Sequence, residues 1–208
     1  MPGDAVVLID GTGAEADAEI LPGGPGAVMA AVLAVRRAKD RDAHVWLGVC
    51  AVRSERLAWV AEKAGELGVA RLAVVQSERA QAFRGGAGTV ARLDRLAREA
   101  AKQSGGTRWM QCEGPLDFAG ALSAAPGAVR AVIDFSGDDF PRSGVPESAA
   151  LLVGPEGGWT PAELEAARAA GWRALRLPTP MLRAETAAIA AVVLAIAGMD
   201  RKTSLPRS

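Results

Sequence analysis

The chain has 208 residues, of which 50% are hydrophobic, and its 24 lysine and arginine residues balance 24 aspartate and glutamate residues. This composition is typical of a folded globular protein, and it excludes a protein that coats nucleic acid through overall positive charge. It leaves room for an enzyme that contacts RNA through one local patch. The length suits one well-buried domain with a smaller second one.

The cysteine and histidine content and the length of the apolar runs exclude several further classes of protein. Cys50 and Cys112 lie far apart and His44 is the single histidine, so ligands for a metal site are lacking and none is predicted. We expect two free thiols in a reducing cytosol. The amino terminus "MPGDAVVLID" has no signal-peptide pattern. The most apolar run, residues 187–198, is shorter than the roughly 20 residues that cross a bilayer. We therefore expect a soluble, cytoplasmic protein.

The first elements form a short β-rich segment. Strands are predicted at 4–11 and 28–35, separated by "ILPGGPG", whose glycines and prolines indicate a loop. The charged run "RRAKDRD" follows, and we place a domain boundary near residue 42.

One motif in this segment resembles a nucleotide site. "GTGAEA", residues 11–16, follows the first strand and matches the dinucleotide fingerprint G-x-G-x-x-A. That fingerprint requires a helix to begin at its glycines, and the next residues, "DAEILPGGPG", cannot form one. Neither a nicotinamide or flavin site nor a P-loop is predicted.

After residue 42 strands and helices alternate. A continuous apolar strand at 44–52, an amphipathic helix at 54–68 and a strand at 69–75 form a βαβ unit, so the two strands should be parallel. The remaining predicted elements are helices at 89–103, 116–125 and 161–170, strands at 128–135, 149–154 and 174–177, and a C-terminal helix opening near 184. The alternation predicts an α/β domain over residues 43–208.

The stretch "LLVGPEGGWTPAEL", residues 151–164, indicates a binding loop. Gly157 and Gly158 would let the backbone adopt positive φ and approach a ligand. Thr160 with Glu163 forms a capping box, so a helix should begin directly after the loop. The loop follows a strand of an α/β sheet, at the edge where such sheets bind ligands. A tight strand-to-helix connection without a ligand is the alternative.

A second stretch, "LPTPMLRAETAAIA" at 177–190, has the same strand–loop–helix order. Glu185 falls in the first helical turn, where the helix dipole alone would favour an acid. Arg183, just before an apolar helix, is harder to explain by packing. An arginine at such a junction is well placed to meet a phosphate or a developing anion.

Together these two stretches closely resemble the signature of the RsmE family, the 16S ribosomal RNA uridine-N3 methyltransferases of the SPOUT class. Other segments are similar to the family as well. They are "AEKAGELGVARLAVVQSER" at 61–79, "REAAKQSG" at 98–105, and "GDAVVLIDGTGAEADAEI" at 3–20, which resembles the second half of a PUA-like barrel. The resemblance spans nearly the whole chain.

The resemblance implies a fold and a cofactor. It implies a SPOUT Rossmann-like α/β domain with a C-terminal trefoil knot over residues 43–208, preceded by a truncated, partial PUA-like β-barrel domain over 1–42, usually in a homodimer. S-adenosylmethionine would bind in the knot, held largely by backbone groups. The implied cofactor-binding residues are Leu152, Val153, Gly154, Pro155, Glu156, Gly157, Gly158, Leu177, Pro178, Met181, Leu182 and Thr186.

The implied reaction needs a base and an anion-stabilising group. Transfer to uracil N3 requires removal of a weakly acidic proton and stabilisation of negative charge on the flanking carbonyl oxygens. We assign stabilisation of the negative charge to Arg183, and the role of the base to either Glu185 or Glu156. Trp159 is expected at the ligand edge, beside Gly158.

Three positions depart from the family pattern. Where the family has a glycine-containing basic turn before the first helix, this chain has Arg53-Ser54-Glu55-Arg56. The family's arginine after "QSG" is replaced by Gly106, with Arg108 as a candidate stand-in. The family's leucine-glycine before the second loop is replaced by Leu177-Pro178. Two alternatives to 16S RNA methylation therefore stay open. One is a SPOUT methyltransferase for another RNA site, and the other is a non-catalytic RNA-binding homologue.

Overall fold

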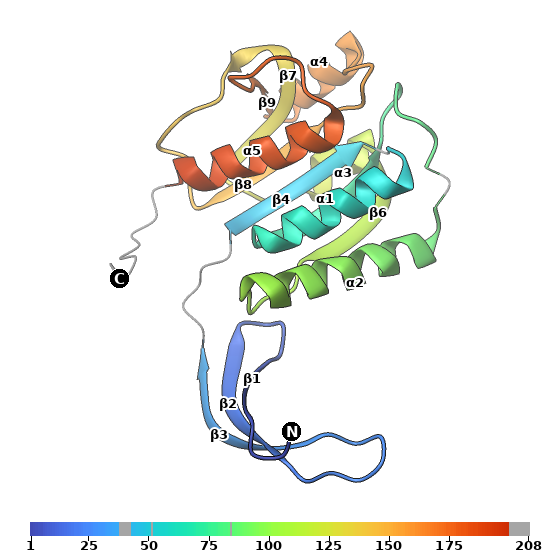
Figure 1. Ribbon diagram of the computed structural model, residues 1–208. Coiled ribbons are helices and arrows are strands. Elements are labelled where there is room, and N and C mark those ends of the chain that lie inside the picture. The colour runs from blue at the N-terminus through green and yellow to red at the C-terminus, as the bar shows by residue number, and fades with distance from the viewer. Residues whose placement is uncertain (38–42, 51, 84, 200–208) are drawn as a thin grey trace.

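The structure, a computed structural model, describes residues 1–37, 43–50, 52–83 and 85–199 and contains two separate sheets (Figure 1). The first sheet is antiparallel with the order β1-β2-β3. Its strands are β1 (Ala5–Ile9), β2 (Ala14–Leu21) and β3 (Met29–Arg37). The predicted boundary near residue 42 lies outside the described residues and stays a prediction.

The motif "GTGAEA" is a hairpin connection, not a phosphate loop. Asp10 Oδ1 accepts hydrogen bonds from the backbone N–H groups of Thr12 (2.7 Å) and Ala14 (3.1 Å), which turns the chain from β1 into β2. The residues after the glycines therefore form a strand that pairs with β1. Periodicity did not indicate this strand, because its apolar positions are mostly small alanines.

The second sheet has six parallel strands in the order β6-β5-β4-β8-β7-β9. Its strands are β4 (Ala43–Cys50), β5 (Val69–Gln76), β6 (Gln111–Asp117), β7 (Val129–Asp139), β8 (Ser148–Val153) and β9 (Arg173–Arg176). The predicted parallel βαβ unit is confirmed, with Leu47 opposite Leu72. Because all six strands run the same way, their carboxyl ends share one edge of the sheet.

Within the described ranges, five helices cover the two faces of this sheet (Figure 1). They are α1 (Ser54–Glu66), α2 (Ala87–Ser104), α3 (Phe118–Ala124), α4 (Pro161–Ala169) and α5 (Ala184–Gly198). Helices α1, α2 and α5 pack over one core, which contains Leu57 and Leu151, and α3 and α4 pack over the other, which contains Trp46 and Leu152. Adjacent β8 residues point into opposite cores because side chains alternate along a strand.

Helix α5 sets the position of the candidate site. After the edge strand β9 the chain returns toward the middle of the sheet, where α5 packs against α1, β4 and β8. Small buried residues on α5, such as Ala188 and Ala191, allow this close approach. The β9–α5 loop is thereby brought to the β8–α4 loop at the carboxyl edge of the sheet. No helix among the described residues is long and apolar enough to span a membrane.

Candidate functional site

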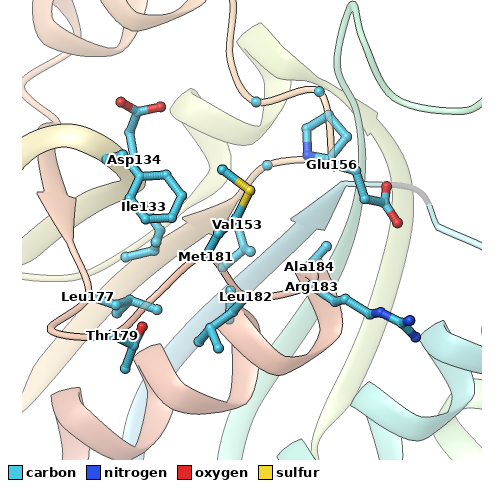
Figure 2. Close-up of a pocket in the computed structure, with 16 residues that line it drawn as sticks. Ile133, Asp134, Val153, Glu156, Leu177, Thr179, Met181, Leu182, Arg183 and Ala184 are labelled. Atoms are coloured by element: carbon cyan, nitrogen blue, oxygen red, sulfur yellow. The ribbon is translucent and has the colours of Figure 1, made fainter.

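A cavity of about 530 Å³ opens at the carboxyl edge of β7, β8 and β9 (Figure 2). Its size falls within the range of small-molecule and cofactor pockets. It is lined by Ile133, Asp134, Phe135, Val153, Gly154, Pro155, Glu156, Gly157, Gly158, Leu177, Thr179, Met181, Leu182, Arg183, Ala184 and Ala187. The two stretches singled out in the sequence thus meet in one cavity.

The β8–α4 loop forms one wall through its backbone. The N–H of Gly158 donates to the carbonyl of Pro155 (2.9 Å), and Gly158 has a φ of +65°, a conformation that favours glycine. At Gly154 a Cβ atom would lie 3.0 Å from the Trp159 ring, so a side chain there would crowd the tryptophan. The glycines therefore give the loop its tight course along the cavity.

Trp159 supports this loop from beneath, and the expectation that it lies at the ligand edge is wrong. Its side chain is buried, its ring packs against Phe118, and its Nε1 donates to the carbonyl of Ile133 (3.1 Å). The indole needs a partner for its N–H, and Ile133 in β7 provides that partner inside the core.

The cap of α4 and two residues that follow β5 hold the same loop in place. The predicted capping box is confirmed: the Thr160 hydroxyl accepts from the Glu163 N–H (3.2 Å) and the Glu163 carboxylate accepts from the Thr160 N–H (2.8 Å). The buried Glu163 also accepts from the N–H of Glu78 (2.9 Å). Arg79 Nη1 donates to the carbonyls of Gly157 (3.0 Å) and Trp159 (3.2 Å).

The β9–α5 loop forms the opposite wall. Leu177 is buried and its carbonyl accepts from the Thr179 N–H (2.8 Å), while Met181 is 80% exposed. Helix α5 begins at Ala184, with Arg183 as its N-cap residue. The first turn of α5 therefore faces the cavity, where its unpaired N–H groups favour negative charge.

The cavity includes most, but not all, of the residues predicted to bind a cofactor. Leu152 is fully buried in the core beneath α3 and α4, and Pro178 and Thr186 are exposed outside the cavity. The lining residues Thr179, Ala184 and Ala187 lie in the second predicted stretch but were not named as cofactor-binding residues, and Ile133, Asp134 and Phe135 lie outside both stretches. The lining residues from β7 were not predicted, because no pattern in the sequence indicates that β7 lies next to β8 in the sheet.

The two proposed bases lie near a cation that was not predicted as a site residue. Glu156 lines the cavity, and its Oε1 is 2.6 Å from Nη1 of Arg56 on α1. Glu185 does not line the cavity; its Oε1 is 3.5 Å from Arg56 Nε, and its side chain is only 13% exposed. Its buried Oε2 has no hydrogen-bond partner among the described residues.

The remaining charged groups of the cavity are Arg183 and Asp134, which extend from opposite sides of it (Figure 2). Arg183 is exposed, and no carboxylate of the described chain lies within ion-pair distance of it. Asp134, in the middle of β7, accepts at Oδ1 from the Ser136 N–H (2.9 Å) and hydroxyl (2.6 Å), which holds its carboxylate in place. A guanidinium without an internal partner is available to an anionic ligand.

Comparisons with known proteins agree with this geometry. A family model described as an RNA methyltransferase domain matches residues 39–196. A probable rRNA-methyltransferase from Porphyromonas gingivalis is 27% identical, with a TM-score of 0.81 over 93% of this chain and 84% of that chain. No curated protein sequence matches the chain.

Two solved structures with a bound cofactor are also similar. A ribosomal RNA small subunit methyltransferase E from Neisseria gonorrhoeae, bound to S-adenosyl methionine, is 26% identical, with a TM-score of 0.80 over 93% of this chain and 82% of that chain. A putative methyltransferase from Legionella pneumophila, in complex with SAM, is 22% identical, with a TM-score of 0.79 over 96% of this chain and 85% of that chain. At this identity the similarity supports the fold alone.

Proposed function

Because the chain belongs to the RNA methyltransferase family of the RsmE type, we propose that it is an S-adenosylmethionine-dependent ribosomal RNA methyltransferase. We further propose that it methylates N3 of a uracil in the 16S RNA of the small subunit. One observation carries the proposal: segments 153–158 and 177–184, distant in sequence, line a single cavity.

The cavity fits S-adenosylmethionine, which supplies an electrophilic methyl group on a sulfonium cation. Val153, Leu177 and Leu182 offer apolar surface for a flat base. The glycine-containing loop brings its polar backbone to the cavity without side chains at Gly154 and Gly158. Such a combination of apolar lining with a few polar backbone groups is what a cofactor pocket requires.

The side chains around the cavity match the needs of N3 methylation. Loss of the N3 proton leaves negative charge on the flanking carbonyl oxygens. The Arg183 guanidinium, which has no ion-pair partner among the described residues, is placed to stabilise it. Glu156 lines the cavity and can accept the proton directly. Glu185, with its open Oε2, is the second candidate base.

Three further features belong to the same proposal. The return of α5 from the edge strand β9 to the sheet centre supports a C-terminal trefoil knot. The apolar α5, with Val193 45% exposed, supports a homodimer. The separate sheet β1–β3 supports a PUA-like RNA-contacting domain. A ribosomal substrate implies a cytoplasmic location.

The test is methyl transfer from labelled S-adenosylmethionine to small ribosomal subunits that lack the modification, with the modified nucleotide mapped by mass spectrometry. A single N3-methylated uracil in 16S RNA is the expected result. A methyl group in another RNA would favour the SPOUT enzyme for another site. RNA binding without cofactor binding or transfer would favour the non-catalytic homologue.

The same assay tests Arg183. Arg183→Ala should lower kcat by about 100-fold or more, because it removes a donor to the developing anion, while cofactor affinity should hardly change. Arg168→Ala, which removes an exposed ion pair with Glu165 on α4, is the matched control and should retain full activity. Unchanged methyl transfer by Arg183→Ala would exclude this role.

A further inference from the structure

We propose that Arg56 is a positioning residue that holds the two loops of the site together. Arg56 lies on α1, outside the cavity, and reaches one carboxylate from each loop region: Glu156 at 2.6 Å and Glu185 at 3.5 Å. The inference rests on the proposed function, because the loops that it joins are the proposed cofactor and substrate walls.

The chemistry of the guanidinium suits this double contact. Its planar group presents N–H donors in several directions, so that Nη1 serves Glu156 while Nε faces Glu185. A lysine ammonium is a compact point charge and could not reproduce both contacts with the same geometry. Arg56 is 30% exposed at its side chain, so it lies at the rim of the site and not in the core.

Glu185 makes this contact consequential. Its carboxylate is largely buried, and one of its oxygens has no hydrogen-bond partner among the described residues. A buried carboxylate that loses its nearby cation becomes strongly unfavourable, and the first turn of α5 would have to move to expose it. That turn carries Ala184 and follows Arg183, both of which line the cavity.

The ion pair with Glu156 connects Arg56 to the other wall of the cavity, the β8–α4 loop. It lies in the loop whose backbone lines the cavity, and its own side chain is half exposed. An exposed ion pair contributes little to global stability. Its loss should therefore leave the fold intact but loosen the β8–α4 loop at the position that faces substrate.

The experiment compares Arg56→Met with Arg56→Lys, using Arg168→Met as a control that removes an ion pair remote from the cavity. Arg56→Met should lower kcat about 10- to 100-fold, because small displacements of reacting groups are costly. Calorimetry should show S-adenosylmethionine affinity within about threefold of the wild type, since Arg56 does not line the cavity. Arg56→Lys should recover part of kcat, and Arg168→Met should behave as the wild type.

Hydrogen exchange gives a second measurement that does not depend on activity. Arg56→Met should accelerate amide exchange in both 155–158 and 184–187, whereas Arg168→Met should accelerate neither. Faster exchange in one segment alone, or in neither, would overturn the proposal. If the wild type transferred no methyl group to RNA, the proposed function would fail, and exchange would still decide whether Arg56 orders both loops.

A double-mutant cycle tests the route of the effect. If Arg56 acts through Glu185, Arg56→Met should add little to the amide exchange rate of 184–187 in a Glu185→Gln background, because the neutral amide no longer needs the cation. Fully multiplicative accelerations of exchange, or an Arg56→Met enzyme with kcat within about twofold of the wild type, would contradict the positioning role.

Discussion

The two sheets contain similar strand residues but bury them very differently. In β3, Val32, Leu33 and Val35 are 55%, 68% and 71% exposed, whereas Leu47 and Leu151 in the parallel sheet are fully buried. The parallel sheet is covered on both faces by helices, and no helix of the described residues packs over β1–β3 in the same way. The parallel sheet is therefore stabilised mainly by burial, and the small sheet by strand pairing and local contacts.

Contacts around Gly11 attach the small sheet to the α/β domain. The Gly11 carbonyl accepts from the Trp109 N–H (3.0 Å), and the Gly13 N–H donates to the Thr107 carbonyl (3.1 Å). Arg98 lies 4.8 Å from the centre of the Trp109 ring. Among the described residues, these backbone hydrogen bonds, the bridges from Gly11 and Thr12 to Arg108, and the Trp109 ring beside Gly11 contribute to the attachment.

The largest difference between the regions should appear in core truncations. Leu151→Ala should lower the free energy of unfolding by about 2–5 kcal/mol, because it opens a cavity between helices and sheet. Val35→Ala on the exposed face of β3 should change it by less than about 0.5 kcal/mol. Urea denaturation measures both. Comparable losses would mean that β3 is buried in the native protein.

A glycine substitution should separate the regions. Gly11 has a φ of +78°, and a Cβ atom there would overlap the Trp109 ring. Gly11→Ala should cost about 1–3 kcal/mol and accelerate hydrogen exchange in β1–β3, while β4 and β8 stay protected. Gly24→Ala, where a Cβ meets open space, is the control. Equal exchange in both variants would show that this contact does not attach the sheet.

A smaller effect is expected at the start of α4. Thr160→Ala removes the capping hydroxyl and should lower the free energy of unfolding by about 1 kcal/mol. The matched variant Thr186→Ala, at an exposed position, should leave it nearly unchanged. Thermal unfolding of the two variants distinguishes a capping role from a general sensitivity to loss of threonine.

The smallest effect concerns thiol chemistry. Burial in the parallel sheet raises the pKa of Cys50 to about 12, so the native thiol should react very slowly with Ellman's reagent at pH 8. A cysteine introduced by Val35→Cys on β3 should react rapidly. Because the unfolded thiol ionises near its ordinary pKa of 9.0, the stability contributed by burying the neutral thiol should fall as pH rises from there toward 12. Rapid labelling of native Cys50 would contradict its burial.

Local patterns predicted the helices and five of the six strands of the parallel sheet, but not β6, and they predicted the position of the binding loops. The βαβ unit, the capping box at Thr160 and the start of α5 near 184 follow from periodicity and helix-start signals, which depend on neighbouring residues. The resemblance to a family then indicated the cofactor. Lateral strand order is not encoded locally, so the contribution of β7 was missed.

The unpredicted parts of the site depend on long-range contacts. Arg56 and Glu156 are 100 residues apart in sequence, and no local pattern indicates that they pair. Trp159 follows the binding loop directly, yet its indole turns inward because β7 supplies a carbonyl there. In both cases the tertiary arrangement, not the sequence neighbourhood, determines what the side chain contacts.

The central claim is that segments 153–158 and 177–184 form one cavity that binds S-adenosylmethionine. Calorimetric titration of S-adenosylmethionine into the wild type and into the variants Ala187→Phe and Ala166→Phe tests it most directly. Ala187 lines the cavity, so phenylalanine there should abolish binding, whereas Ala166 is exposed on α4 and its variant should bind like the wild type. Absence of binding to the wild type, or undiminished binding to Ala187→Phe, would contradict the account.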